Sequence, residues 1–124
     1  MQRRPFSLSV VAWVFIAVGA VTTAVTLLPL FGATSASTAP GALGRPWTEF
    51  WVVLGVRFLA LVFGASILRG ANWARWGAMA WLAFHLFISI PHSVVAVLVH
   101  GLLFSVAAYL LFRPGAGAYF RRST

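Results

Sequence analysis

The chain has 124 residues, of which 61% are hydrophobic and 8% are charged, and its formal net charge is +8. A soluble globular domain carries about 25% charged residues, and a chain this short cannot hide so much apolar surface from water. The composition therefore predicts a single integral membrane domain and excludes an ordinary water-soluble one.

Four apolar segments are long enough to cross a bilayer, which takes roughly 20 residues of helix. The predicted helices cover residues 6–31, 47–68, 73–90 and 92–112, with an outer loop at 32–46 and a tail at 113–124. The expected fold class is all-α, as an antiparallel bundle of four transmembrane helices.

The first segment has an alternative interpretation as a cleaved signal peptide. Two arginines precede it and small residues at 33–39 follow it, as in such signals. Its uncharged run is about 24 residues long, whereas the apolar core of a signal peptide has roughly 7–15 residues. We therefore predict a first transmembrane helix.

The last two segments follow each other without a loop. As one helix, residues 73–112 would measure roughly 60 Å, which is two membrane thicknesses. Pro91 removes a backbone donor and disfavours helix at Ile90, so a tight helical hairpin is expected there. Before this hairpin, Gly70 is expected to end the second helix and Asn72 to cap the third.

The arginines predict the orientation, because cytoplasmic loops are enriched in Lys and Arg. With four crossings, seven arginines fall on one side, and only Arg45, offset by Glu49, falls on the other. Arginine without lysine, together with abundant Ala, Gly and Trp, is typical of a GC-rich bacterial genome. We therefore predict a multi-pass bacterial inner-membrane protein with both termini in the cytoplasm. The expected membrane-surface anchors are Arg3, Arg4, Arg69, Arg75, Arg113, Arg121, Arg122, Trp47, Trp73, Trp76 and Tyr119.

The residue types exclude several kinds of site. No cysteine is present, which removes disulfides, thiolate metal sites and cysteine nucleophiles. With Glu49 as the single acid, paired catalytic carboxylates and a carboxylate metal site are not expected. No Walker loop, HExxH or GxSxG pattern occurs, so we expect no enzyme. The arginines are not gathered on one face, so we expect no nucleic-acid partner.

The candidate binding site consists of polar residues at membrane depth. Arg57 lies about ten residues from either end of its helix, where a charge costs several kcal/mol. At 1.5 Å per residue, Arg57, His85 and His100 lie roughly 8–12 Å from the outer surface, near Thr22 and Thr26. They could bind an anionic group, or they could only pack against neighbouring helices. We expect no cofactor, and haem or a chlorophyll-type pigment on the histidines is the alternative.

Pairs of small residues four positions apart let helices approach each other closely. The chain contains four such pairs: Ala20 with Ala24, Ala60 with Gly64, Ala74 with Ala78, and Gly101 with Ser105. They fit packing within a bundle and docking to a partner equally well.

The second half of the chain, from Arg57 to Arg122, contains four short motifs. They are Leu68-Arg69-Gly70, Asn72-Trp73-Ala74-Arg75-Trp76, Tyr109-Leu110-Leu111-Phe112-Arg113-Pro114 and Ala118-Tyr119-Phe120-Arg121. This half resembles a family of small, uncharacterised four-helix proteins of the bacterial inner membrane. The resemblance implies the fold and the location, and it brings no activity and no functional residues.

Three function classes remain open. The first is a non-catalytic accessory subunit that packs against and stabilises a larger respiratory, photosynthetic or transport complex, or another copy of itself. The second is a small-molecule site for haem, quinone, pigment or anionic lipid in the bundle core, using Arg57, His85 and His100. The third is a transporter or channel subunit, although a coupled transporter usually needs an acid at membrane depth, which this chain lacks.

Overall fold

The computed structural model describes residues 5–31 and 46–121, and the regular structure in these residues is helical. The helices are α1 (Phe6–Phe31), α2 (Trp47–Leu68), α3 (Asn72–Ser89), α4 (Val94–Phe112) and α5 (Pro114–Arg121). The predicted all-α class is confirmed. Helices α1 and α2 have the expected bounds, whereas α3 is displaced by one residue and α4 begins two residues later than expected.

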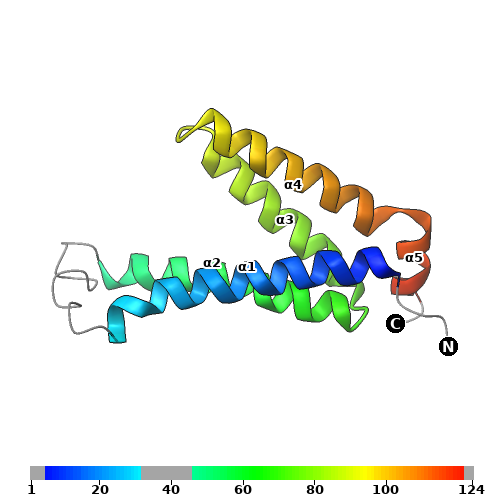
Figure 1. The fold of residues 1–124 in the computed structure, drawn as a ribbon, viewed down its shortest axis with the longest axis horizontal. Coiled ribbons are helices and arrows are strands. Elements are labelled where there is room, and N and C mark those ends of the chain that lie inside the picture. The colour runs from blue at the N-terminus through cyan, green and yellow to red at the C-terminus, as the bar shows by residue number, and fades with distance from the viewer. Residues whose placement is uncertain (1–4, 32–45, 122–124) are drawn as a thin grey trace.

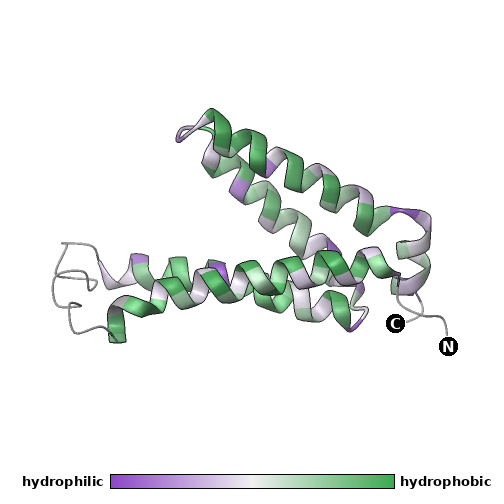
Figure 2. Cartoon of the chain, in the orientation of Figure 1, coloured by the Kyte–Doolittle hydropathy of each residue, from purple (hydrophilic) through white to green (hydrophobic). Residues whose placement is uncertain are grey.

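Three helices in residues 5–31 and 46–121 are long and apolar enough to cross a membrane, namely α1, α2 and α4. Helix α3 has 18 residues, but Asn72, Arg75 and His85 interrupt its apolar sequence and leave it less hydrophobic. Figure 2 shows the difference as paler colouring of α3. The structure therefore supports a membrane protein, and the fourth expected span is not confirmed.

The four long helices form two antiparallel hairpins, α1 with α2 and α3 with α4 (Figure 1). The hairpins meet where α1 begins, α2 passes into α3, and α5 lies; we call this the basal end. They diverge toward the distal end, where the turn between α3 and α4 lies. Because the hairpins separate, the antiparallel four-helix bundle expected from the sequence is not confirmed.

Glycine allows α1 and α2 to pack closely. A Cβ on Gly64 would lie 2.7 Å from both the carbonyl oxygen of Ala12 and Cγ1 of Ile16. A Cβ on Gly19 would lie 2.8 Å from the backbone nitrogen of Leu61. The backbones of the two helices therefore approach to a distance that a larger side chain would prevent.

Only some of the small-residue pairs lie at helix interfaces. Ala60 and Gly64 are buried against α1, and Ala74 and Ala78 are buried in the core. Ala20 and Ala24 are exposed, and so is Ser105.

The connection from α2 to α3 is a glycine turn. Gly70 has φ of 78°, and its N–H donates to the Ile67 carbonyl at 3.0 Å. The Ala71 N–H donates to the Ser66 carbonyl at 3.0 Å, which completes a Schellman motif. The expected helix end at Gly70 is confirmed. The expected cap is wrong, because Asn72 already belongs to α3 and no side chain caps that helix.

The turn from α3 to α4 forms the predicted tight hairpin. The His92 N–H donates to the Ser89 carbonyl at 3.1 Å, which continues the end of α3. The Ser93 side chain then accepts from the Ala96 N–H at 3.5 Å, and α4 begins at Val94. Pro91 lies between these two contacts, so the helix breaks where its missing donor predicts.

Helix α5 closes the basal end and is absent from the sequence prediction. Its Phe120 side chain is 0% exposed, and the Tyr119 hydroxyl donates to the Leu68 carbonyl at 3.1 Å. These two aromatic residues therefore pack against the other helices, whereas Arg121 is exposed. The core at this end includes the buried side chains Leu8, Ala12, Phe15, Ile67, Ala74, Ala78, Leu82, Leu111 and Phe120.

Candidate functional site

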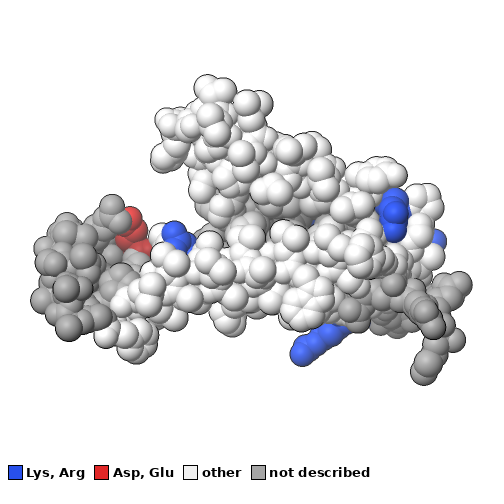
Figure 3. Space-filling model, in the orientation of Figure 1, with Lys and Arg blue, Asp and Glu red and all other residues white. Residues whose placement is uncertain are grey.

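Some of the predicted membrane-surface anchors are exposed, and others, namely Arg75, Arg113 and Tyr119, are half-buried. Arg69, Trp47, Trp73 and Trp76 are exposed, as an anchor requires. On the face shown in Figure 3, basic side chains lie mostly toward the basal end, and the long faces of the helices carry little charge. The remaining terminal and loop arginines, Arg3, Arg4, Arg45 and Arg122, lie outside the described residues.

Arg75 is a half-buried cation enclosed by aromatic rings. Its Cζ lies 5.7, 5.0 and 5.5 Å from the ring centroids of Trp76, Phe112 and Phe120, respectively. These distances are within the range of cation–π attraction. The guanidinium is therefore positioned by α3, α4 and α5 together, and it is more than a simple surface anchor.

Arg57 binds across the α1–α2 hairpin. Its Nη1 donates to the Thr22 carbonyl at 3.1 Å and to the Thr26 hydroxyl. Depth along the helices had predicted this grouping of Arg57, Thr22 and Thr26. Both partners are neutral, and no acidic side chain in residues 5–31 and 46–121 pairs with Arg57. Glu49 lies two turns earlier on α2, about 12 Å along the axis.

The two histidines face each other across the α3–α4 hairpin. Their rings are stacked, with centroids 6.1 Å apart and planes 22° apart. Nδ1 of His85 donates to the Trp81 carbonyl at 2.9 Å, and Nδ1 of His100 donates to the Ala96 carbonyl at 2.8 Å. Ser89 joins them, since its hydroxyl donates to the His85 carbonyl at 2.7 Å and accepts from His100 Nδ1 at 3.1 Å.

In the neutral form of each imidazole, these contacts determine the tautomer. A carbonyl can only accept, so each Nδ1 carries the hydrogen and each Nε2 keeps a lone pair. Neither Nε2 has a hydrogen-bond partner within the described residues. Nor do these residues contain a cluster of three metal-ligating side chains, so His85 and His100 form a pair rather than a metal cage.

Trp81 connects the arginine to the histidines, and the sequence analysis missed this role. Its Nε1 donates to the carbonyl of Val56, the residue before Arg57, at 2.8 Å. Its ring lies 3.9 Å from the His85 ring, centroid to centroid, and 5.7 Å from the Phe15 ring. Polar groups from all four long helices therefore form one row across the molecule.

The Trp81 hydrogen bond predicts a measurable stability difference. Trp81→Phe removes the Nε1 donor but keeps an aromatic ring, so the free energy of unfolding should fall by about 1 kcal/mol. Unfolding in mixed micelles, followed by circular dichroism, measures this change. The matched control is Trp51→Phe, because Trp51 is exposed and its ring contact is with Phe50 of its own helix. Equal stability losses in the two variants would contradict the linking role of Trp81.

The row combines one fixed cation with two imidazole rings in apolar surroundings. Such a set attracts an acidic group, and its Nε2 lone pairs can accept a hydrogen bond or ligate a metal. Comparison of the chain with protein families, with curated proteins and with solved structures finds no match. The resemblance to a four-helix inner-membrane family therefore stays a prediction, and the function has to be argued from the site.

Proposed function

We propose that the protein is a non-catalytic accessory subunit of the bacterial inner membrane that packs against and stabilises a larger membrane complex. In this proposal all four long helices cross the bilayer, α3 crosses together with α4, and the basal end faces the cytoplasm. The excess of arginine at the basal end supports this orientation.

The observation that carries the proposal is the uncompensated charge of Arg57. At membrane depth a guanidinium costs several kcal/mol unless an acid or many hydrogen bonds compensate it. Arg57 binds one carbonyl and one hydroxyl, and both are neutral. A partner helix that carries an aspartate or glutamate at the same depth would complete the pairing.

The partner that fits this charge is a different chain. Glu49 is the single acid in the sequence, and it lies two turns from Arg57 toward the distal end. A second copy therefore brings no acid to the depth of Arg57.

The angle between the two hairpins supports the same proposal. It leaves the distal faces of α1 and α4 unpacked against each other, so they are free to contact a partner (Figure 1).

The test is extraction of the tagged full chain from its native membrane in mild detergent. We expect a large, colourless assembly on a native gel, and mass spectrometry should find a partner with an acid in a transmembrane helix. Migration as a small colourless species, with no second protein, would overturn the accessory-subunit proposal.

The free Nε2 atoms of His85 and His100 favour one alternative, a bound haem or chlorophyll-type pigment. A visible spectrum of the same preparation tests it. A ligated pigment gives an absorption band that His85→Ala or His100→Ala abolishes. His92→Ala is the matched control, because His92 is exposed in the α3–α4 turn. A colourless isolated chain rules out this alternative for coloured ligands.

A further inference from the structure

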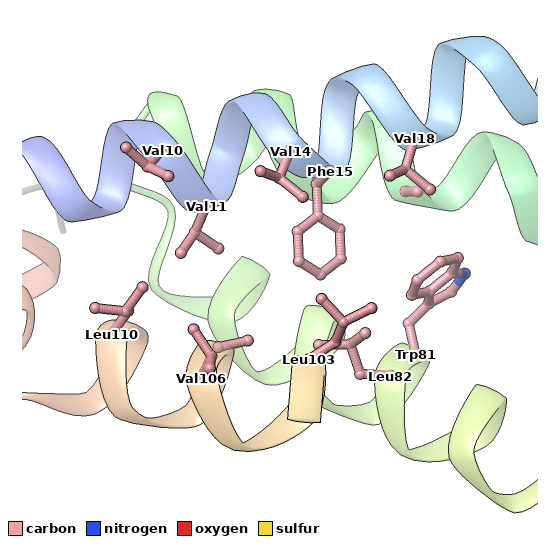
Figure 4. A pocket seen from close by; sticks show the side chains of 12 residues that line it. Val10, Val11, Val14, Phe15, Val18, Trp81, Leu82, Leu103, Val106 and Leu110 are labelled. Carbon is pink, nitrogen blue, oxygen red and sulfur yellow. The ribbon is translucent and has the colours of Figure 1, made fainter. Parts of the chain in front are cut away.

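An apolar cavity lies between the two hairpins, on the basal side of the polar row. Its volume is about 170 Å³, and the side chains around it are almost entirely apolar. Figure 4 shows Val10, Val14 and Val18 of α1 on one side of it and Leu103, Val106 and Leu110 of α4 on the other. The cavity is partly open, so in a bilayer its contents come from the membrane.

The basal mouth of this cavity carries positive charge. Nη2 of Arg113 donates to the Ser7 hydroxyl, which joins the end of α4 to the start of α1. Ser7 and Arg113 each lie three residues from a lining residue, Val10 and Leu110, so this contact lies at the end of the cavity. Arg75 lies 5.0 Å above the ring of Phe112, the neighbour of Arg113.

Arg113 at the mouth and Arg75, which lies over the ring of the neighbouring residue Phe112, both lack charge compensation. In the described segments neither Arg75 nor Arg113 pairs with a carboxylate, and Nε of each is buried without a hydrogen-bond partner. Both side chains are only half-buried, so part of each remains accessible from outside. An anion at the mouth would therefore meet the guanidinium of Arg113 and the hydroxyl of Ser7, while Arg75 lies beside the ring of Phe112.

We propose that this site binds one anionic phospholipid, with an acyl chain in the cavity and the phosphate at Arg113. Along α1 the cavity extends from Val10 to Val18, which is about 12 Å. One leaflet contributes about 15 Å of hydrocarbon, half of the roughly 30 Å core. The cavity therefore runs from the headgroup level to near the bilayer middle. This proposal does not depend on the partner subunit proposed for Arg57.

The size of the cavity supports a lipid chain over a protein helix. An apolar cavity of about 150 Å³ holds a molecule the size of benzene, so 170 Å³ accommodates part of an acyl chain. A helix with its side chains is about 10 Å across and does not fit. The charge at the mouth then selects among lipids, because basic pockets between transmembrane helices bind anionic headgroups.

The test measures lipid retention by the purified full chain, using native mass spectrometry after exchange into micelles that contain phosphatidylglycerol or phosphatidylcholine. We expect one phosphatidylglycerol to be retained and phosphatidylcholine to be lost. Arg113→Gln should weaken this retention by about tenfold, as expected for loss of a charge-assisted hydrogen bond. Arg69→Gln is the matched control, since Arg69 is an exposed arginine of the α2–α3 connection at the same end of the molecule.

A second variant tests the cavity separately from the charge. Val106 lines the cavity and is 48% exposed, so Val106→Phe fills space without disturbing the buried core. It should lower phosphatidylglycerol retention while Arg75 and Arg113 stay in place. Inorganic phosphate should not compete, because it has no acyl chain.

Three results would each overturn the lipid proposal. The first is equal retention of both lipids by the unaltered protein, which requires no variant to fold. The second is an equal loss with Arg69→Gln and Arg113→Gln, which would indicate attraction by net charge alone. The third is unchanged retention in Val106→Phe, which would place the lipid outside the cavity.

Discussion

Replacement of Gly64 by alanine should separate α1 from α2 and destabilise the protein by about 1–3 kcal/mol, the usual cost of overpacking a tight interface. The added Cβ would lie 2.7 Å from the Ala12 carbonyl oxygen and 3.0 Å from the Ile16 backbone nitrogen. Backbone atoms cannot move aside as the end of a side chain can, so the two helices must shift apart. Unfolding in mixed micelles, followed by circular dichroism, measures the loss.

Gly55 provides the matched control for this change. It lies on the same helix, and a Cβ added there meets nothing within 4 Å. Gly55→Ala should therefore be neutral or slightly stabilising, because alanine is the better helix former. If the two substitutions have equal effects, close backbone approach at Gly64 does not hold the α1–α2 hairpin together.

Arg57→Leu should release the protein from the proposed complex while leaving the isolated chain folded. Removal of one member of a buried ion pair costs on the order of 3–5 kcal/mol, so association should weaken at least about 100-fold. In the isolated chain the same change removes two hydrogen bonds and also a charge that is costly at membrane depth. Its free energy of unfolding should therefore stay the same or rise.

For Arg57→Leu, comigration of the chain with the proposed partner on a native gel measures association. Unfolding of the isolated chain measures its free energy of unfolding. Arg57→Lys is the control that keeps the charge, and it should retain part of the association. Neutralisation of the partner's acid should produce the same loss as Arg57→Leu. Undiminished comigration of Arg57→Leu would separate this residue from assembly and remove the main support for the proposed function.

The helices that the sequence predicts well are those set by local signals. Helices α1 and α2 have the expected bounds because each is an apolar run that ends at glycine- or proline-containing sequence. The turn at Pro91 was equally predictable from its missing backbone donor. Helix α5 was not, because two glycines in eight residues oppose helix, and its order depends on the distant contacts of Tyr119 and Phe120.

The sequence predicts how far along its helix each residue of the candidate site lies, but it does not predict which neighbours each side chain contacts. The helix rise sets how far each residue lies along its axis, so Arg57 was grouped correctly with Thr22 and Thr26. The role of Trp81 was missed because tryptophan in such a chain is first interpreted as an interfacial residue. The divergence of the hairpins was also missed, since the spacing of small residues does not show which pairs meet.

The burial of Phe120 sets an order for biosynthesis. Phe120 belongs to the same buried cluster as Leu8, yet the ribosome adds it only after α1, α2, α3 and α4 have been made. The basal core therefore cannot close before α5 has been synthesised. A nascent chain that stops before α5 leaves that core open and lacks the hydroxyl that binds the Leu68 carbonyl. Products that lack α5 consequently display an apolar surface that membrane proteases and chaperones can distinguish from chains that include it.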